Sequence, residues 1–377
     1  MKHIVIINPY FFPGFKAGGP VQSIVNLIGS LNKEYNFSVI TSAYDLNEIT
    51  PYANIKPDEW NEINLNEIAL KCFYASANIS RVKMKELILE TAADLVFING
   101  LYSHSFFWNP LSLAKQLKVL GIHTILSPRG MLQQSNLAIK SFKKKPYLQL
   151  VKWLGFTNHI SWHATDEQEL IDIKKNFSNN AKVNIAGNIP KQPWLFSVNN
   201  KSPHQLKLVF LSLIAEKKNL LKTIELIKRC NNQVSLDIYG PIKDTGYWQQ
   251  CLSAIDDEKR IQYKGAIIPN EVQNILSTYD AMILLTKGEN FGHAIFESFS
   301  VGVPVITSHF TPWSNLQQKS AGWNIDIDDP DSIMHLLNAL SDKNKEEWQA
   351  YNNGALSLAQ AYFQQQNFSE VYKALFT

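Results

Sequence analysis

The chain has 377 residues, of which 45% are hydrophobic and 18% are charged, a balance typical of globular proteins with a large core. A chain of this length suggests two domains. The formal net charge of +3 is too small to argue for a nucleic-acid partner, and no run approaches the roughly 18 apolar residues of a membrane span.

Strand-like and helix-like segments alternate through the first half of the chain, which favours parallel sheets with right-handed crossovers. The first apolar run ends at Asn8-Pro9, too short for a signal peptide, so we interpret it as a core strand. The predicted strands are residues 3–8, 37–41, 94–99, 123–127, 159–163 and 182–186, and the predicted helices include residues 21–31 and 111–120.

Residues 187–205 contain three prolines and little periodicity, which predicts a linker. The alternation then restarts, and the tail from about residue 346 to residue 376 has a helical pattern. The expected strands of this second half are residues 206–213, 235–239, 281–285 and 303–307, with a helix over residues 220–230.

Two carboxylates, Glu289 and Glu297, stand around Asn290-Phe-Gly292 where a buried strand gives way to a helix. Ligands of parallel α/β sheets bind at the carboxyl ends of strands, and glycine at a helix N-terminus brings backbone amides close to a phosphate. Carboxylates beside such an anion site can hold hydroxyl groups, which predicts a site for a sugar and a ribose.

The string Gly288-Glu-Asn-Phe-Gly-His-Ala-Ile-Phe-Glu297, with Gly302-Val-Pro-Val305 and Thr311-Pro-Trp313 behind it, resembles the E-x7-E motif of retaining GT-B glycosyltransferases. The resemblance is to the group 1, GT4-like family, in a branch that makes bacterial surface polysaccharide. It implies that Glu289 contacts the donor hexose and Glu297 the ribose. Asn290, Phe291 and Gly292 would also bind the donor.

The resemblance implies a GT-B α/β fold, with two Rossmann-like doubly wound domains facing across a cleft. Residues 1–188 would form the acceptor domain and residues 189–359 the nucleotide-sugar donor domain. A helix over about residues 360–377 would pack back on the first domain. Gly18 and Gly19 would form a loop that closes near the donor phosphate, although a plain tight turn is the alternative.

The second domain opens with Phe210-Leu-Ser-Leu-Ile-Ala-Glu-Lys-Lys-Asn-Leu220, close to the family pattern F-L-S-R-I-x-x-K-K-x-L. By that pattern Lys218 neutralises the donor diphosphate. Leu213 stands where the pattern has an arginine, and leucine offers no donor to phosphate oxygens. Gly240, which ends a strand in Asp237-Ile-Tyr-Gly240, resembles the part of the family that faces the nucleotide.

In the first domain, Ser127-Pro-Arg-Gly-Met-Leu132 resembles a string of the same branch, with Arg129 where more distant relatives have a histidine. Asn99, at the end of the preceding strand, would share this acceptor side. We assign Arg129 a catalytic role toward a donor or acceptor phosphate, and a structural ion pair is the alternative.

Neither a metal nor a cofactor is predicted, because the chain lacks zinc-binding spacings and the diphosphate site is basic. Three scattered cysteines, with no disulfide pattern, indicate a reducing compartment, so we expect a cytoplasmic protein. Residues 141–155 mix lysines with aromatic residues, which fits peripheral contact with an anionic membrane or a solvated helix face.

The sequence therefore predicts a retaining, metal-independent glycosyltransferase. Its donor would be a nucleotide-diphosphate sugar, UDP favoured over GDP, and its acceptor a carbohydrate or a lipid-linked oligosaccharide of a bacterial surface glycan. Two alternatives remain. One is a non-catalytic partner that binds a nucleotide sugar, which Leu213 favours, and the other is a GT-B sugar-nucleotide epimerase.

Overall fold

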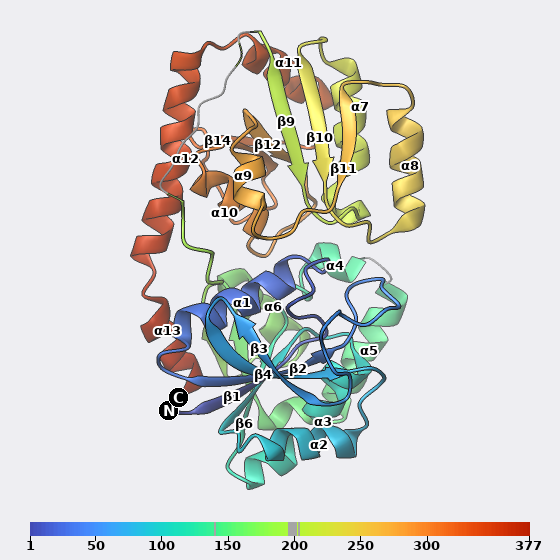
Figure 1. The fold of residues 1–377 in the computed structure, drawn as a ribbon, viewed down its shortest axis with the longest axis vertical. Coiled ribbons are helices and arrows are strands. Elements are labelled where there is room, and N and C mark those ends of the chain that lie inside the picture. The colour runs from blue at the N-terminus through green and yellow to red at the C-terminus, as the bar shows by residue number, and fades with distance from the viewer. Residues whose placement is uncertain (139–140, 195–201, 203) are drawn as a thin grey trace. The chain divides into compact units, whose positions relative to one another are not determined.

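The chain forms two compact units in the computed structural model, which describes residues 1–138, 141–194, 202 and 204–377 (Figure 1). The first unit comprises Met1–Ile189 and Asn367–Thr377, and the second comprises Pro190–Gln366. Residues 195–201 and 203 of the predicted linker lie outside the described residues. The chain returns to the first unit at residue 367, later than the expected position near 360, because a single helix continues to Gln365.

The first unit is built on an eight-stranded sheet of order β3-β4-β2-β1-β5-β6-β7-β8. All its strand pairs are parallel except β3 with β4, which form an antiparallel hairpin at one edge. The strands are β1 His3–Ile7, β2 Asn36–Ser42, β3 Trp60–Leu65, β4 Ile68–Ala75, β5 Leu95–Asn99, β6 His123–Ser127, β7 Ser161–Ala164 and β8 Val183–Ile185.

Helices cover both faces of this sheet because its central strands are apolar on both sides. Ile4 and Ile6 of β1 pack with α1 and the C-terminal α13, whereas Val5 and Ile7 pack on the opposite face with α2, α3, α5 and α6. The helices are α1 Gly19–Leu31, α2 Arg81–Glu90, η1 His104–Trp108, α3 Asn109–Val119, α4 Gln134–Ala138, α5 Ser141–Trp153, η2 Phe156–His159, α6 Glu167–Asn176 and α13 Phe368–Phe376.

The second unit contains a six-stranded parallel sheet of order β11-β10-β9-β12-β13-β14. This order reverses between β9 and β12, as in a dinucleotide-binding fold. The strands are β9 Leu206–Leu211, β10 Val234–Tyr239, β11 Ile261–Gly265, β12 Ala281–Leu284, β13 Val305–Ser308 and β14 Gly322–Ile325.

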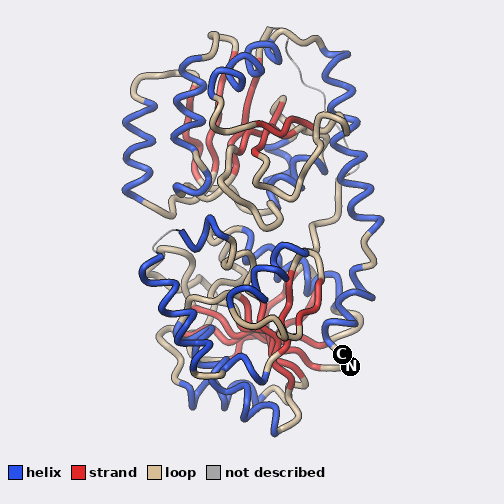
Figure 2. The backbone as a smooth tube through the Cα atoms, turned by 180° about the vertical axis from the view of Figure 1, so that it is seen from behind, coloured by secondary structure: helices blue, strands red, loops and turns tan. Residues whose placement is uncertain are grey.

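Helices also flank the second sheet, and Figure 2 shows both sheets in red between blue helices. Helix α10 packs against α12 and α9, and α7 packs against α8 and α11. The helical segments are η3 Glu216–Lys218, α7 Leu220–Arg229, α8 Thr245–Ile255, α9 Val272–Leu276, α10 His293–Ser300, α11 Pro330–Ser341 and α12 Lys345–Gln365. The predicted α/β class with two doubly wound domains is thus confirmed.

The structure corrects some local predictions. The hairpin of β3 and β4 and the last strand β14 were not expected, and β9 ends at Leu211, two residues before the predicted end at Leu213. Within the described residues, no helix is long and apolar enough to cross a membrane.

Candidate functional site

The carboxyl ends of β9 and β12 meet at the point where the strand order of the second sheet reverses. Each strand is followed by a loop, and the two loops are tied together by hydrogen bonds to the carbonyl of Lys217. Lys287 N donates to Lys217 O at 2.9 Å, and Thr286 Oγ1 donates to the same carbonyl at 3.3 Å. Ligands of this fold bind at such a reversal, so we place the candidate site here.

Lys218 and Glu289, predicted from separate motifs, form an ion pair at this edge. Lys218 ends the turn η3 after β9, and Glu289 lies in the loop after β12. The side chains are mostly withdrawn from solvent, with exposed fractions of 17% and 11%. A shielded pair of opposite charges holds both groups at the strand ends, where an incoming anion would compete with Glu289 for Lys218.

Helix α10 begins directly after this loop, and Gly292 provides its N-terminal cap. Gly292 has φ 79°, a left-handed conformation that disfavours side chains, and a Cβ there would lie 3.0 Å from Ile295 Cδ1. The first amides of a helix have no preceding turn to donate to, so they are available to an anion. The position of Gly292 thus gives the loop an anion-binding geometry.

Glu297 lies on α10 and is buried. Burial raises the pKa of its carboxyl group to about 7, and the nearby positive charge of Lys191 opposes that shift. Glu289 and Glu297 therefore differ in environment, because the first is paired with a lysine and the second is held inside the unit.

The loop between the two carboxylates is anchored by aromatic packing. Phe291 is buried against Trp313, with ring centroids 5.4 Å apart, and Trp313 Nε1 donates to Phe291 O at 2.6 Å. Glu289 N donates to Phe310 O at 2.9 Å. The side chain of Phe291 thus belongs to the core, and Asn290 beside it is half-buried. Trp313, which only flanks the motif in the sequence, thus holds this loop in place.

The predicted residues of the first unit gather at the carboxyl ends of β1, β5 and β6. Gly18 caps α1, which begins at Gly19 after the loop from β1. Asn99 is the last residue of β5 and is buried. The strand order of the first sheet reverses between β1 and β5, so these residues also stand at a switch point.

Arg129, in the loop after β6, reaches into the interior of the first unit. Its Nε donates to Asn99 Oδ1 at 3.0 Å and its Nη1 donates to Asn188 Oδ1 at 2.7 Å. The guanidinium carbon lies 5.8 Å from the centroid of the Phe97 ring. These contacts give Arg129 a structural role here, and its action on a phosphate stays a prediction.

His163 and Glu169 complete a buried polar network around the Arg129 loop. Burial, and then the charge of Arg129, lower the pKa of His163 to about 3, so the imidazole is neutral. Its Nε2 donates to Ala186 O at 2.7 Å, and its Nδ1 then accepts from Ser127 Oγ at 2.9 Å. Glu169 accepts from Thr165 N at 2.8 Å and from Gly130 N, which fixes the turn that carries Arg129.

Residues 191–356 match the family model for glycosyl transferases group 1. The second unit is a group 1 glycosyltransferase domain. This confirms the family predicted from the sequence. No curated protein matches the chain in sequence.

Solved structures of glycosyltransferases share the fold of the whole chain. Sucrose-phosphate synthase from Thermosynechococcus elongatus aligns with a TM-score of 0.74 at 14% identity, covering 100% of this chain and 99% of that one. Anabaena HepE in complex with UDP and glucose aligns at 0.70 and 11% identity, covering 100% and 99%. WaaG, a glycosyltransferase involved in lipopolysaccharide biosynthesis, aligns at 0.66 and 12% identity, covering 99% and 98%. The predicted GT-B fold is confirmed.

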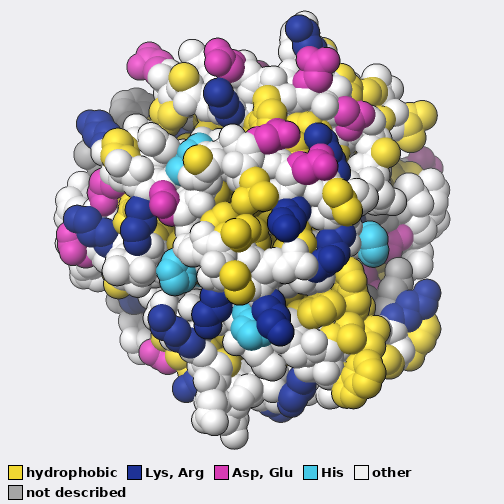
Figure 3. All heavy atoms as spheres, turned by 90° about the horizontal axis from the view of Figure 1, so that it is seen from below, with side chains coloured by type: hydrophobic (Ala, Val, Ile, Leu, Met, Phe, Trp, Pro, Cys, Tyr) yellow, Lys and Arg dark blue, Asp and Glu magenta, His cyan; other side chains and the backbone are white. Residues whose placement is uncertain are grey.

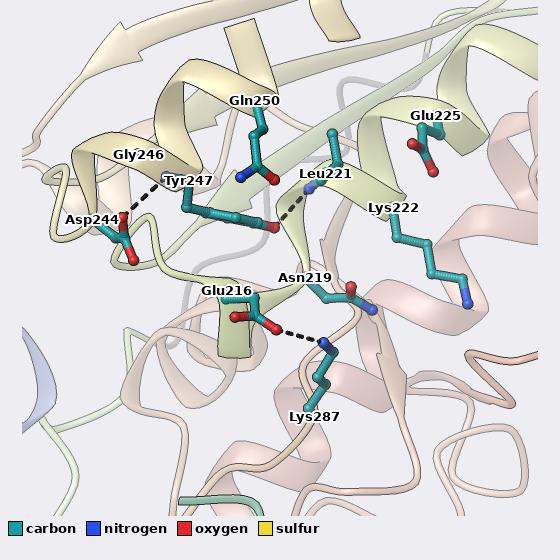
Figure 4. Close-up of a pocket in the computed structure, with 10 residues that line it drawn as sticks. All are labelled: Glu216, Asn219, Leu221, Lys222, Glu225, Asp244, Gly246, Tyr247, Gln250 and Lys287. Atoms are coloured by element: carbon teal, nitrogen blue, oxygen red, sulfur yellow. Dashed lines mark hydrogen bonds and ion pairs between the residues drawn. The ribbon is translucent and has the colours of Figure 1, made fainter. Parts of the chain in front are cut away.

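An open hollow of about 570 Å³ lies beside the η3 turn of the glycosyltransferase domain (Figure 4). Lys287 and Glu216 point toward each other at its edge, with Nζ and Oε1 3.4 Å apart. Its lining includes three carboxylates and two lysines, so it suits an anion poorly. The lining residues are Glu216, Asn219, Leu221, Lys222, Glu225, Asp244, Gly246, Tyr247, Gln250 and Lys287.

Two further residues that the sequence singled out, Leu213 and Gly240, lie in the glycosyltransferase domain. Leu213 was expected to end the strand. It lies instead in the loop beyond β9 and is half-buried, so it is not a core residue. Gly240 follows β10. Within the described residues, no group of three or more histidine, cysteine, aspartate or glutamate side chains is arranged to hold a metal ion.

Proposed function

We propose that the chain is a retaining glycosyltransferase that moves a hexose from a nucleotide-diphosphate donor to a glycan acceptor. The observation that carries this proposal is the Lys218–Glu289 pair at the strand-order reversal, beside the N-terminus of α10. A cation and free helix amides suit a diphosphate, and a carboxylate suits sugar hydroxyls. Glu297, one helical turn further on, is assigned to the ribose.

In this proposal the protein positions charge rather than supplying a strong base. The acceptor hydroxyl attacks the anomeric carbon from the face that the diphosphate leaves, and a donor phosphate oxygen takes the hydroxyl proton. Lys218 and the first amides of α10 stabilise the negative charge that develops on the leaving diphosphate. Glu289 orients the hexose, so its pair with Lys218 opens or is shared when the donor binds.

We infer that the donor is a UDP-sugar and that no cofactor takes part. UDP is favoured because HepE, which shares the fold, was solved with UDP and glucose. In this proposal Lys218 and the first amides of α10 supply positive charge to the diphosphate, so the proposal includes independence from divalent metal. Gly18 and Gly19 of the first unit are assigned to the donor phosphate, and Asn99 and Arg129 to the acceptor side.

A lipid-linked acceptor would bring the protein to a membrane, and helix α5 supports this part of the proposal. Phe142 and Trp153 are 73% and 81% exposed, whereas Leu148 and Val151 on the other side of the helix are buried. Lys143, Lys145 and Lys152 of the same helix are also exposed. Basic amphipathic helices bind anionic lipid surfaces. The face drawn in Figure 3 mixes basic and hydrophobic side chains, with few acidic ones in its lower half.

Leu213 favours a second candidate, a nucleotide-sugar-binding partner without transferase activity. Without an arginine at this position the diphosphate site has less positive charge, which weakens leaving-group stabilisation more than binding. Turnover of the donor separates the two candidates, since a binding partner neither hydrolyses nor transfers the sugar. An epimerase would instead convert the donor sugar without any acceptor.

The deciding experiment starts from a thermal-shift screen against UDP- and GDP-sugars. A ligand at 100 times its Kd adds about 2.7 kcal/mol of stability, which is easily detected. The stabilising donor is then incubated with simple sugar and lipid-linked acceptors, and the product is examined by NMR. We expect nucleoside diphosphate release and a product with the anomeric configuration of the donor. An inverted product contradicts the retaining mechanism, and stabilisation without turnover supports the binding partner.

A further inference from the structure

The donor site of the second unit has Lys218 at its centre, but that lysine already faces Glu289. A nucleoside diphosphate carries more negative charge than one shared ammonium group can balance. Leu213, at the position where the family pattern has an arginine, cannot contribute a charge. A second cation close to Lys218 would therefore strengthen the diphosphate site.

The loop after β10 is fastened to the loop after β9. Ile214 N donates to Pro241 O at 2.9 Å, and the amides of Lys243 and Asp244 both donate to Ile214 O, at 3.1 and 3.3 Å. These bonds place the backbone of Lys243 beside the segment that contains Leu213.

Gly240 permits this close approach. It has φ 145°, and a Cβ at this position would lie 1.8 Å from the carbonyl oxygen of Ser212. Any other residue would push the two loops apart. Gly240, which was predicted to face the nucleotide, therefore also fixes the position of the backbone that leads to Lys243.

Lys243 lies within the electrostatic reach of Lys218. Burial of its ammonium group, although the residue as a whole is exposed, and then repulsion from Lys218 lower the pKa of Lys243. Asp244, the adjacent carboxylate, caps α8 by accepting from Tyr247 N at 3.0 Å. Two ammonium groups that repel each other on adjoining loops form a centre that an anion would stabilise.

We propose that Lys243 is the second diphosphate-binding cation of this chain. It would supply the positive charge of the arginine that the family pattern has at the position of Leu213. This inference rests on the proposed function, because it assigns a further residue to the same donor site. Lys243 would contact a non-bridging oxygen of the diphosphate. As a compact point charge on a flexible stem, lysine can bind phosphate without the planar geometry of an arginine.

Calorimetric titration of the intact protein with UDP, GDP and uridine tests the inference. We expect Lys243→Ala to weaken binding of the preferred nucleoside diphosphate by about tenfold to a hundredfold, the usual effect of losing a charged hydrogen bond. Lys243→Arg should stay within about threefold of the wild type, and uridine binding should not change. Lys259→Ala removes an equal charge from an exposed position in the same unit and is the matched control.

A compensating variant makes the test sharper. Leu213→Arg introduced into Lys243→Ala should recover part of the lost affinity, since it restores a cation beside the same loop. The inference is overturned if Lys243→Ala and Lys259→Ala bind the diphosphate equally well while the wild type binds it tightly. A wild-type protein that binds neither UDP nor GDP instead contradicts the proposed function, so the two failures can be told apart.

Discussion

Glu289 and Glu297 carry the same functional group but lie in different surroundings. Glu289 faces a lysine at the edge of the sheet, and Glu297 is buried on α10 with the pKa of its carboxyl group raised to about 7. The sequence placed both near one loop, but it did not show that Glu289 would be paired or that Glu297 would be shielded. Those differences come from the packing of residues far apart in the chain, which no local pattern encodes.

Removal of each carboxylate should have a different effect. Glu289→Ala should abolish sugar transfer but keep or strengthen UDP binding, because Lys218 loses its partner and is free for the diphosphate. Glu297→Ala should weaken UDP binding by roughly 1.5–3 kcal/mol, the value of a charged hydrogen bond. Calorimetry with UDP and a transfer assay measure the two effects. Glu216→Ala, which removes an exposed carboxylate near the same turn, is the control. Equal losses of UDP binding in the two site variants would refute the assignment.

The buried carboxyl group of Glu297 should make stability depend on pH. Its pKa in the folded protein is raised above the ordinary value of 4.5, so its contribution to stability is complete below about pH 4.5 and is lost as pH rises through about 7. Compared with Glu297→Gln, the wild type should therefore lose on the order of 1–3 kcal/mol of unfolding free energy between pH 5 and pH 8. Urea titrations of both proteins measure this difference. Glu225→Gln, on the exposed side of α7, should show no such trend, and parallel curves for Glu297→Gln would contradict the burial.

At the scale of elements, strong apolar runs were predictable and polar edge elements were not. Strand β6 has its predicted bounds, His123–Ser127, because its residues after His123 are buried. The hairpin of β3 and β4 was missed because half of the residues of β3 are polar and the strand lies at an edge, so no apolar run marks it. The turn residues Asn66 and Glu67 have positive φ angles of 51° and 72°, as two-residue hairpin turns require. Asn66 was the one residue in the sequence that could have indicated this turn, because asparagine is favoured there.

The site was predictable where one motif contains it and not where separate loops meet. Glu289, Gly292 and Glu297 lie in a single string, so the sequence identified them together. The approach of Lys243 to Lys218 depends on hydrogen bonds between the loops after β9 and β10, and nothing in either segment indicates it. Arg129 is similar, because its partners Asn99 and Asn188 lie 30 and 59 residues away.

The last helix, α13, is a structural part of the first unit, so its loss should be costly. Phe376 is buried, although it is the second-last residue, and its ring packs on Tyr35 at 5.4 Å and on Phe97 at 5.7 Å. Phe376→Ala should therefore destabilise the protein by about 3–5 kcal/mol. Phe142→Ala, at an exposed position on α5, should change stability by less than about 0.5 kcal/mol. Similar urea midpoints for the two variants would show that α13 is not docked.

At the scale of the whole molecule, we predict that transfer needs no divalent metal. The positive charge for the diphosphate would come from Lys218, Lys243 and the start of α10, which are built into the second unit. Activity should therefore persist in EDTA at a rate within about twofold of that in Mg²⁺ or Mn²⁺. Loss of transfer in EDTA and its recovery with Mn²⁺ would show that the protein's own cations are insufficient.

A crystal structure of the protein with UDP tests the location of the donor site most directly. We predict that the diphosphate lies against Lys218 and the first amides of α10, that the ribose hydroxyls meet Glu297, and that the Lys218–Glu289 pair has opened or is shared. UDP bound at another part of the chain, with Lys218 still paired to Glu289, would contradict the assignment of the β9–β12 edge as the donor site.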